Sequence, residues 1–328
     1  MIYPWQQAQW AHLQQRCNEK SLAHAFLFSG PAGVGKNDFA SAFANSLLCS
    51  QPKGDGQACK ECNSCRWMSS GAHPDSIHIG LEGDSKVIGV DQIRSLGHFL
   101  SLKSQQGRYK VIVITPAEKM NVNAANSLLK SIEEPAENTI IILVSSSITA
   151  LPATVRSRCQ KLEFPYPVHD EALAWLTQAA GTTSEDPNIL LSIAKGAPLH
   201  ALTMASGDIL KQRSAFFADL LKLAEGAEHP IKIGEKWLKQ DIYQILSWFH
   251  GALADMIKLN MLEKQVEICH VDYIDALQSC ATRLDLVKLY RCYEHVGSAQ
   301  QMLKANMNPQ LLLESILIPW ADINTGLR

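Results

Sequence analysis

The stretch that decides the fold is Ala25-Phe26-Leu27-Phe28-Ser29-Gly30-Pro31-Ala32-Gly33-Val34-Gly35-Lys36-Asn37. Its apolar start predicts a short buried strand, and the residues that follow, to about Cys49, have helical spacing. A glycine-rich loop between a strand and a helix is the setting of a P-loop, in which backbone N–H groups and the helix dipole face a phosphate. We therefore predict a phosphate-binding loop, with an ordinary glycine-rich turn as the alternative, formed by Gly30, Gly33, Gly35, Lys36 and Asn37.

Two later segments predict further strands of the same sheet. Val111-Ile112-Val113-Ile114 is β-branched throughout, and Ile140-Ile141-Ile142-Leu143-Val144 is equally apolar, as expected for parallel strands that are buried on both faces. Between them, residues 123–134 have helical spacing and stop at Pro135. Strands that alternate with helices predict an α/β parallel sheet, which we assign to residues 1–166.

The strand pattern ends near Pro167, and the rest of the chain is predicted to be all-helical. Residues 168–206 have the pattern of three short helices with breaks near Gly181 and Gly196, and longer amphipathic helices follow around 243–262, 284–303 and 311–318. We therefore expect two helical domains, at 167–207 and 208–328.

The composition is that of a folded protein whose own charge does not drive DNA binding. The chain has 328 residues, 46% of them hydrophobic, and 30 basic against 32 acidic side chains give a net charge of -2. No apolar run reaches the roughly 18–20 residues that span a bilayer, and the first residues lack a signal-peptide pattern. We expect a cytoplasmic protein, whose 9 cysteines are reduced thiols or metal ligands.

Other parts of an ATP-hydrolysing site are missing from the sequence. A working P-loop has Ser or Thr at the position of Asn37, because that hydroxyl binds Mg²⁺. An acidic pair is needed at the end of a later strand, but Thr115-Pro116 follows Val111–Ile114, and we interpret Glu118 as a surface charge that points elsewhere. Binding of ATP or ADP stays open, whereas hydrolysis by this chain alone is not expected.

Four closely spaced cysteines predict a metal site. Cys49, Cys59, Cys62 and Cys65 have the pattern C-x₉-C-x₂-C-x₂-C, and four thiolates satisfy tetrahedral Zn²⁺ in a closed, structural site. An iron–sulfur cluster and unliganded thiols are the alternatives, and His73 is a less favoured ligand. The isolated cysteines are interpreted as buried structural thiols: Cys17, Cys269, Cys280 and Cys292.

An arginine pair lies before a short predicted strand at 160–164. Arg156 and Arg158 fit simple surface charges, but a guanidinium offered to the γ-phosphate of a neighbouring subunit, an arginine finger, is the functional alternative.

Four stretches together resemble the bacterial clamp-loader subunits of the AAA+ superfamily. They are the P-loop, the Cys49–Cys65 cluster, Asn126-Ser127-Leu128-Leu129-Lys130-Ser131-Ile132-Glu133-Glu134-Pro135, and Ser157-Arg158-Cys159. The stretch Asn308-Pro309-Gln310-Leu311-Leu312-Leu313-Glu314 is similar to the last collar helix of the family. The resemblance covers nearly the whole chain.

The resemblance implies a fold and a division of the chain. We expect an AAA+ RecA-like domain with a zinc-binding insert at 49–65, a small helical lid domain at 167–207 and a C-terminal helical collar domain at 208–328. Lys130 and Glu134 fit a helix-stabilising ion pair, and the family implies that this segment faces a neighbouring subunit.

The resemblance also implies a function without hydrolysis. Asn37, Thr115-Pro116 and Leu199 replace three nucleotide-handling features of the motor subunits, whereas Ser157-Arg158-Cys159 is intact. The chain is therefore expected to be a non-catalytic component of the DNA polymerase III holoenzyme that supplies Arg158 in trans. The implied partners are the gamma or tau motor subunits, the delta subunit and, through the assembled complex, the sliding clamp and primed DNA.

Two other functions remain to be weighed. The retained Lys36 favours an active P-loop ATPase, either a motor clamp-loader subunit or a DNA-repair AAA+ protein. The cysteine cluster permits a zinc-dependent nucleic-acid-binding module, although the basic residues around it are few, namely Lys53, Lys60 and Arg66.

Overall fold

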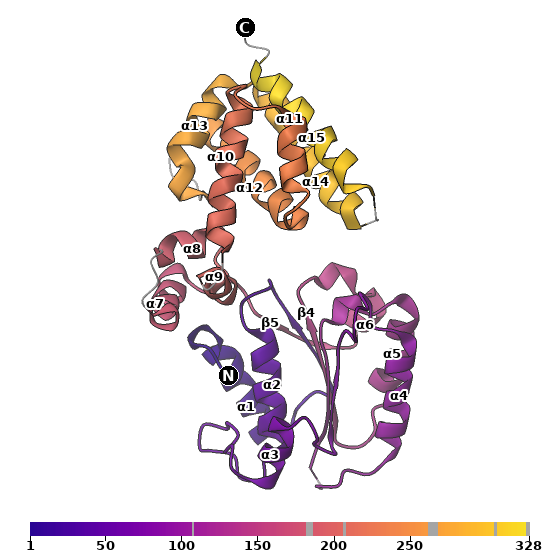
Figure 1. Ribbon diagram of the computed structural model, residues 1–328. Coiled ribbons are helices and arrows are strands. Elements are labelled where there is room, and N and C mark those ends of the chain that lie inside the picture. Colours follow the sequence, from indigo (N-terminus) through magenta and orange to yellow (C-terminus); the bar gives the residue numbers. More distant parts are fainter. Residues whose placement is uncertain (107, 182–185, 206–207, 262–267, 305–306, 326–328) are drawn as a thin grey trace. The chain divides into compact units, whose positions relative to one another are not determined.

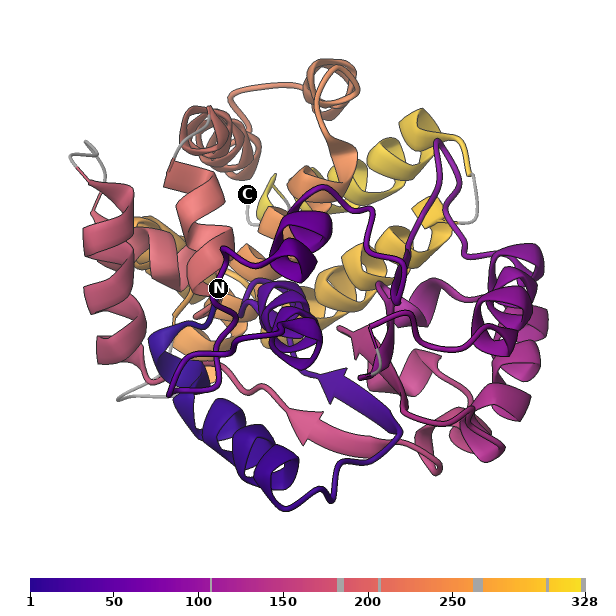
Figure 2. The same cartoon turned by 90° about the horizontal axis from the view of Figure 1, so that it is seen from below.

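Five parallel strands form the sheet of the N-terminal part of the chain (Figure 1). The computed structural model describes residues 1–106, 108–181, 186–205, 208–261, 268–304 and 307–325. The strand order is β2-β3-β4-β1-β5. The bounds are β1 Ala25–Ser29, β2 Ser76–Ile79, β3 Lys110–Ile114, β4 Thr139–Ser145 and β5 Gln160–Glu163. Figure 2 shows β1 (indigo) beside β5 (pink), which are paired in parallel.

Helices cover both faces of this sheet. α1 (Gln7–Asn18) and α2 (Lys36–Leu48) lie on one face, and α4 (Val90–Ser101) and α5 (Val122–Glu133) lie on the other (Figure 1). Strand residues alternate between the two cores, as the two-residue period of a strand requires. Leu27, Ile112 and Ile141 pack with α4 and α5, whereas Phe26, Val111 and Ile142 pack with α1 and α2. The prediction of an α/β parallel sheet is confirmed.

The strand pairing brings three loops to one edge of the sheet. Ser29, the last residue of β1, is level with Ser145 of β4, and Ile114 of β3 is level with Leu143. The loops that follow β1, β3 and β4 therefore leave from the same, carboxyl edge. This edge carries the predicted P-loop.

Short elements complete this part of the chain. They are η1 (Pro4–Gln6), α3 (Asn63–Ser69), η2 (Ala117–Lys119), η3 (Ile148–Ala150) and α6 (Ala153–Arg156). Neither β2 nor α4 was predicted from the sequence.

The chain forms two compact units, each of which makes most of its contacts within itself. The first contains Met1–Trp175 and Ala197–His200, and the second contains Leu176–Gly196 and Ala201–Arg328. Two helices, α7 (His169–Ala180) and α9 (Pro198–Ala205), contribute to both units. The predicted boundary at 207 and the predicted helix end at 262 lie outside the described residues, and the division into lid and collar domains stays a prediction.

The described residues of the second unit form helices and no strand, as predicted. Its remaining helices are α8 (Pro187–Ile193), α10 (Ile209–Ala224), α11 (Pro230–Trp237), α12 (Ile242–Met261), η4 (Val271–Tyr273), α13 (Ile274–Arg283), α14 (Leu286–Lys304) and α15 (Pro309–Thr325). α12 packs against α13 and α14, and α15 packs against α10, α11 and α14. Trp237, Phe249 and Trp320 lie fully buried in the core between these helices.

Candidate functional site

The loop between β1 and α2 has the backbone shape of a P-loop. Gly30, Gly33 and Gly35 all have positive φ angles, of 153°, 77° and 87°. A methyl group at Gly30 would lie 2.0 Å from the carbonyl oxygen of Phe164, and one at Gly35 would lie 2.4 Å from the ring of Tyr3. Only glycine fits these two positions without displacing the neighbouring backbone or ring.

Lys36 is turned toward the carbonyl groups of its own loop. Its Nζ donates hydrogen bonds to the carbonyl oxygens of Gly30 (2.7 Å) and Pro31 (2.6 Å), and lies 3.3 Å from Oγ of Ser146. Burial lowers the pKa of Lys36 to about 8, and the negative charge of Glu118 acts in the opposite direction. The ammonium group therefore occupies the loop through protein contacts alone.

The side chains of Asn37 and Thr115 are hydrogen-bonded to each other at the positions where an ATPase would bind its metal ion. The Thr115 hydroxyl donates to Oδ1 of Asn37 at 2.8 Å. Both residues lie at the carboxyl edge, one at the start of α2 and the other directly after β3. The expected absence of an acidic pair directly after β3 agrees with this neutral contact, because neither group carries the charge that a divalent cation requires.

Glu118 does not point away, so its interpretation as an outward surface charge was wrong. η2 turns the chain back over the carboxyl edge, and the backbone N–H of Ser146 donates to Oε1 of Glu118 at 3.2 Å. Oε2 is buried and has no hydrogen-bond partner among the described residues. The carboxylate is half-buried and acts electrostatically on Lys36.

Residues that the sequence did not single out support the loop. Trp5 Nε1 and Gln6 Nε2 both donate to the carbonyl oxygen of Val34, at 3.0 and 2.9 Å. The backbone N–H of Leu199 donates to the carbonyl oxygen of Gly33 at 3.0 Å. No sequence signal links these distant segments to the loop. The contact of Leu199 with the P-loop is made by its backbone, at the position where the family resemblance leads us to expect an arginine in a motor subunit.

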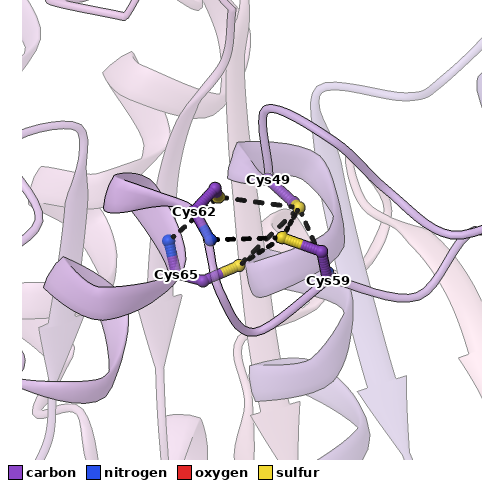
Figure 3. Close-up of side chains that lie close together, drawn as sticks. All are labelled: Cys49, Cys59, Cys62 and Cys65. Atoms are coloured by element: carbon purple, nitrogen blue, oxygen red, sulfur yellow. Dashed lines mark hydrogen bonds between the residues drawn. The ribbon is translucent and has the colours of Figure 1, made fainter.

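The four predicted cysteine ligands converge on one point (Figure 3). Cys49 ends α2, Cys59 and Cys62 lie in the following loop, and Cys65 lies in α3. The distances from Cys49 Sγ to the sulfurs of Cys59, Cys65 and Cys62 are 3.5, 3.6 and 3.9 Å, and the Cys59–Cys65 distance is 3.9 Å. Sulfurs bound tetrahedrally at 2.3 Å from zinc are about 3.8 Å apart. The donor set and its spacing therefore fit a tetrahedral metal ion.

Backbone N–H groups favour the thiolate form in this cluster. Those of Glu61 and Cys62 donate to Cys59 Sγ at 3.5 and 3.3 Å, and they lower the pKa of the Cys59 thiol. The backbone N–H of Cys59 donates to Cys49 Sγ, and that of Cys65 donates to Cys62 Sγ. Since thiolates are the metal-binding form of cysteine, these bonds assist metal binding.

His73 lies outside the four-cysteine cluster but supports it. Its Nδ1 accepts from the backbone N–H of Asp75 at 3.0 Å, so its proton lies on Nε2 and is donated to Ser64 Oγ at 2.7 Å. Ser64 in turn donates to the carbonyl oxygen of Leu48 at 2.7 Å. This buried chain of hydrogen bonds joins α3 to the end of α2, and thereby fixes the backbone that carries Cys49 and Cys65.

Two of the cysteines outside the cluster match the expectation of buried thiols. Cys280 and Cys292 are buried, whereas Cys17 and Cys269 are only partly buried.

Arg158 lies on the turn between α6 and β5, at the amino edge of the sheet. Its Nε forms an ion pair with Oε1 of Glu133 at 2.6 Å, and its Nη1 donates a hydrogen bond to the carbonyl oxygen of Thr154 at 3.0 Å. The side chain is 40% exposed. β5 starts at Gln160, level with Phe26 near the start of β1, which puts Arg158 at the opposite end of the strands from the P-loop.

The end of α5 meets Arg158, a contact that the sequence did not predict. Glu133 is its last residue, and the carbonyl oxygen of Ile132, one residue earlier, is bonded to His24 just before β1. The expected Lys130–Glu134 ion pair is absent from the salt bridges of the described residues, and Glu133 pairs with Arg158 instead. Arg156, by comparison, is half-buried.

Comparisons with known proteins agree with these features. The family described as "DNA polymerase III, delta subunit" matches residues 5–167, and its C-terminal domain matches residues 207–322. The chain is 34% identical to "DNA polymerase III subunit delta'" of Pseudomonas aeruginosa, with 98% of each chain covered. It is 26% identical to the protein of the same name from Escherichia coli, covering 96% of this chain and 94% of the relative.

More distant similarities are to other subunits. A Bacillus subtilis protein named "DNA polymerase III subunit tau" is 32% identical over 68% of this chain and 40% of its own. A solved gamma subunit-related protein from Thermotoga maritima aligns with a TM-score of 0.49 at 18% identity, over 95% and 99% of the two chains. The full-length matches define the class: the chain belongs to the DNA polymerase III delta' subunit family. The predicted resemblance to the bacterial clamp-loader subunits is confirmed, and Asn37, Thr115-Pro116 and Leu199, which differ from the motor subunits, favour delta' within that family.

No helix among the described residues is long and apolar enough to cross a membrane.

Proposed function

We propose that this chain is a non-hydrolysing subunit of the clamp loader in the DNA polymerase III holoenzyme, and that it supplies Arg158 to the ATP site of a neighbouring motor subunit. The position of Arg158 carries the proposal. It lies at the amino edge of the sheet, whereas the chain's own P-loop lies at the carboxyl edge. From Phe26 to Gly30 alone the strand rises about 13 Å, so Arg158 is out of reach of its own loop.

The neutral contact between Thr115 and Asn37 supports the second half of the proposal. A motor subunit needs a metal-binding hydroxyl and a carboxylate where these two side chains bond to each other. The chain therefore contributes transition-state charge stabilisation to a neighbour rather than its own hydrolysis. The names of its relatives fit partners of the gamma or tau type and a delta subunit, and the helical second unit fits a collar.

The expected cycle is one of assembly. ATP binding by the motor subunits would close the ring of subunits and open the sliding clamp, and primed DNA would trigger hydrolysis and release the clamp in a cytoplasmic setting. The formal charge of this chain, -2, fits a subunit that leaves most of the DNA grip to the assembly.

Zinc is the metal we propose for Cys49, Cys59, Cys62 and Cys65. Four thiolates at the observed separations leave no open position, so the ion would stabilise the fold and not take part in a reaction. One zinc ion per chain, measured after purification without added metal, is the expected stoichiometry.

The alternative is an active P-loop ATPase, and one observation favours it. The half-buried carboxylate of Glu118 faces the carboxyl edge and acts on Lys36, as an acidic residue of an ATPase would. Mg²⁺-dependent ATP turnover by the isolated chain decides between the two. Turnover at the rate of a motor subunit would overturn the non-hydrolysing proposal, and a nucleotide-binding titration would separately show whether the loop accepts ATP or ADP.

The test of the trans role is Arg158→Ala in a reconstituted loader with unaltered motor subunits. Removal of an arginine finger costs on the order of 10³–10⁵ in rate at the site it serves. We expect clamp- and primed-DNA-stimulated ATP turnover to fall while the complex still assembles in gel filtration. Arg94→Ala, which removes an exposed arginine of α4, is the matched control. Unchanged turnover with Arg158→Ala would refute the trans role.

A further inference from the structure

The contact between Arg158 and the end of α5 has a directional geometry. Guanidinium has five N–H donors, of which Nε–H points back along the side chain and the others form the terminal fork. Oε1 of Glu133 lies 2.6 Å from Nε, the closest approach of the two charged groups, and the carbonyl oxygen of Thr154 accepts one Nη1–H at 3.0 Å. Glu133 and Thr154 therefore contact the guanidinium at Nε and at one N–H of Nη1, and neither contacts Nη2.

We propose that Glu133 is a positioning residue that orients Arg158 for the γ-phosphate of the neighbouring subunit. The proposal rests on the trans role of Arg158 given above. Binding through Nε leaves the Nη2 end of the fork for phosphate oxygens, which guanidinium binds in a bidentate manner. Arginine loses side-chain entropy when it is fixed in one rotamer, and Glu133 fixes it before the neighbour arrives.

Stability does not account for this ion pair. The side chains of Arg158 and Glu133 are 40% and 46% exposed, and ion pairs at such positions contribute little to the free energy of unfolding. The backbone on both sides is held by other means. Cys159 is buried in the core beside Val155, and the carbonyl oxygen of Ile132 is bonded to His24. The turn and the helix end thus stay in place without the carboxylate, and what the carboxylate adds is the orientation of the guanidinium.

The alternative geometry, in which Glu133 competes with the phosphate, makes a different prediction. A carboxylate bound across the terminal fork would have to leave before phosphate binds, and its removal would raise turnover. The observed contact through Nε predicts the reverse, a loss of turnover. Because Arg158 stays protonated in either case, the effect is one of orientation and not of charge state.

The experiment is a set of variants in the reconstituted loader, read as clamp- and primed-DNA-stimulated ATP turnover. Glu133→Ala is expected to lose about half or more of the turnover that Arg158→Ala loses, with the KM for ATP unchanged, since orientation acts on the transition state. Glu133→Gln is expected to lose less turnover than Glu133→Ala, because the amide oxygen can still lie beside Nε although the charge of the ion pair is lost. Glu82→Ala removes an exposed glutamate outside the segment that carries Glu133; it is the matched control and is expected to match the unaltered chain.

A double variant separates positioning from a general structural role. Arg158→Ala combined with Glu133→Ala is expected to equal Arg158→Ala alone, since Glu133 acts only through the arginine. A further loss in the double variant, or normal turnover with Glu133→Ala when Arg158→Ala is impaired, would overturn the positioning role and leave the trans role standing. Normal turnover with Arg158→Ala would overturn both. Gel filtration of every variant complex checks assembly.

Discussion

Replacement of one cysteine of the cluster, Cys62→Ser, tests the metal site most directly. Four of the sulfur separations are 3.5 to 3.9 Å, close to the edge of a zinc–thiolate tetrahedron, and all four sulfurs lie within 4.8 Å of one another, so binding needs little rearrangement of the protein. The change removes one thiolate and leaves the three others. We expect the zinc content to fall from one per chain to a small fraction of that.

The size of the stability loss follows from binding linkage. Structural zinc sites bind with apparent free energies of about 10–16 kcal/mol, and a Kd of about 1 nM, near −12.3 kcal/mol, is within that range. At about 1 μM free zinc, a thousandfold excess over this Kd, the bound ion stabilises the fold by about 4.1 kcal/mol. For a unit of the size of Met1–Trp175, each kcal/mol shifts the melting temperature by about 2–4 °C, so the expected fall is about 8–16 °C.

The assay is thermal unfolding at buffered free zinc, together with metal analysis of the same samples. Cys17→Ser is the matched control, because Cys17 is a partly buried thiol outside the cluster. The melting temperature of the unaltered protein should rise with free zinc, and that of Cys62→Ser should not. A variant with the zinc content and melting temperature of the unaltered chain would refute the zinc site.

Two further predictions concern the P-loop. Gly30→Ala should lower the free energy of unfolding by roughly 3 kcal/mol in urea titrations, because the added methyl group lies 2.0 Å from the carbonyl oxygen of Phe164 and φ is 153°. The control Gly97→Ala, in α4, places its methyl group in open space and should stabilise the protein slightly. Equal stabilities of the two variants would contradict the packing argument. Glu118→Gln should lower the pKa of Lys36 below its value of about 8, because the carboxylate favours the ammonium form. NMR titration of the Lys36 ε-carbon measures this pKa, and an unchanged titration midpoint would contradict the prediction. Since the folded pKa lies below the unfolded value of 10.5, the ammonium form is disfavoured in the folded state, and stability should rise as the pH increases from about 8 to 10.5.

The strands of the sheet centre and one edge strand, β5, could be predicted from the sequence, but the other edge strand, β2, could not. The β-branched runs at β3 and β4 are buried on both faces, which makes them continuous apolar signals. β2 has only four residues, Ser76–Ile79, and two of them, Ser76 and His78, are polar. A strand this short and only partly buried carries little sequence signal, and α4 was missed with it.

The candidate site divides along similar lines. The four cysteines were predictable because metal ligation fixes both residue type and local spacing. The Thr115–Asn37, Glu118–Ser146 and Glu133–Arg158 contacts were not, since each joins segments that lie far apart in the chain. Glu118 was misjudged for this reason. Its position after the end of β3 suggests a side chain that points away from the P-loop, but η2 turns the chain so that Glu118 contacts Ser146.

The glycines and the lysine of the P-loop can be explained either by nucleotide binding or by packing within the protein. Gly30 and Gly35 are required by close contacts with Phe164 and Tyr3. Lys36 is likewise held by the carbonyl oxygens of its own loop. Packing is therefore sufficient to account for Gly30 and Gly35 and for the burial of Lys36. Arg158, by contrast, is exposed and lies at the opposite, amino edge of the sheet, where a second subunit can reach it.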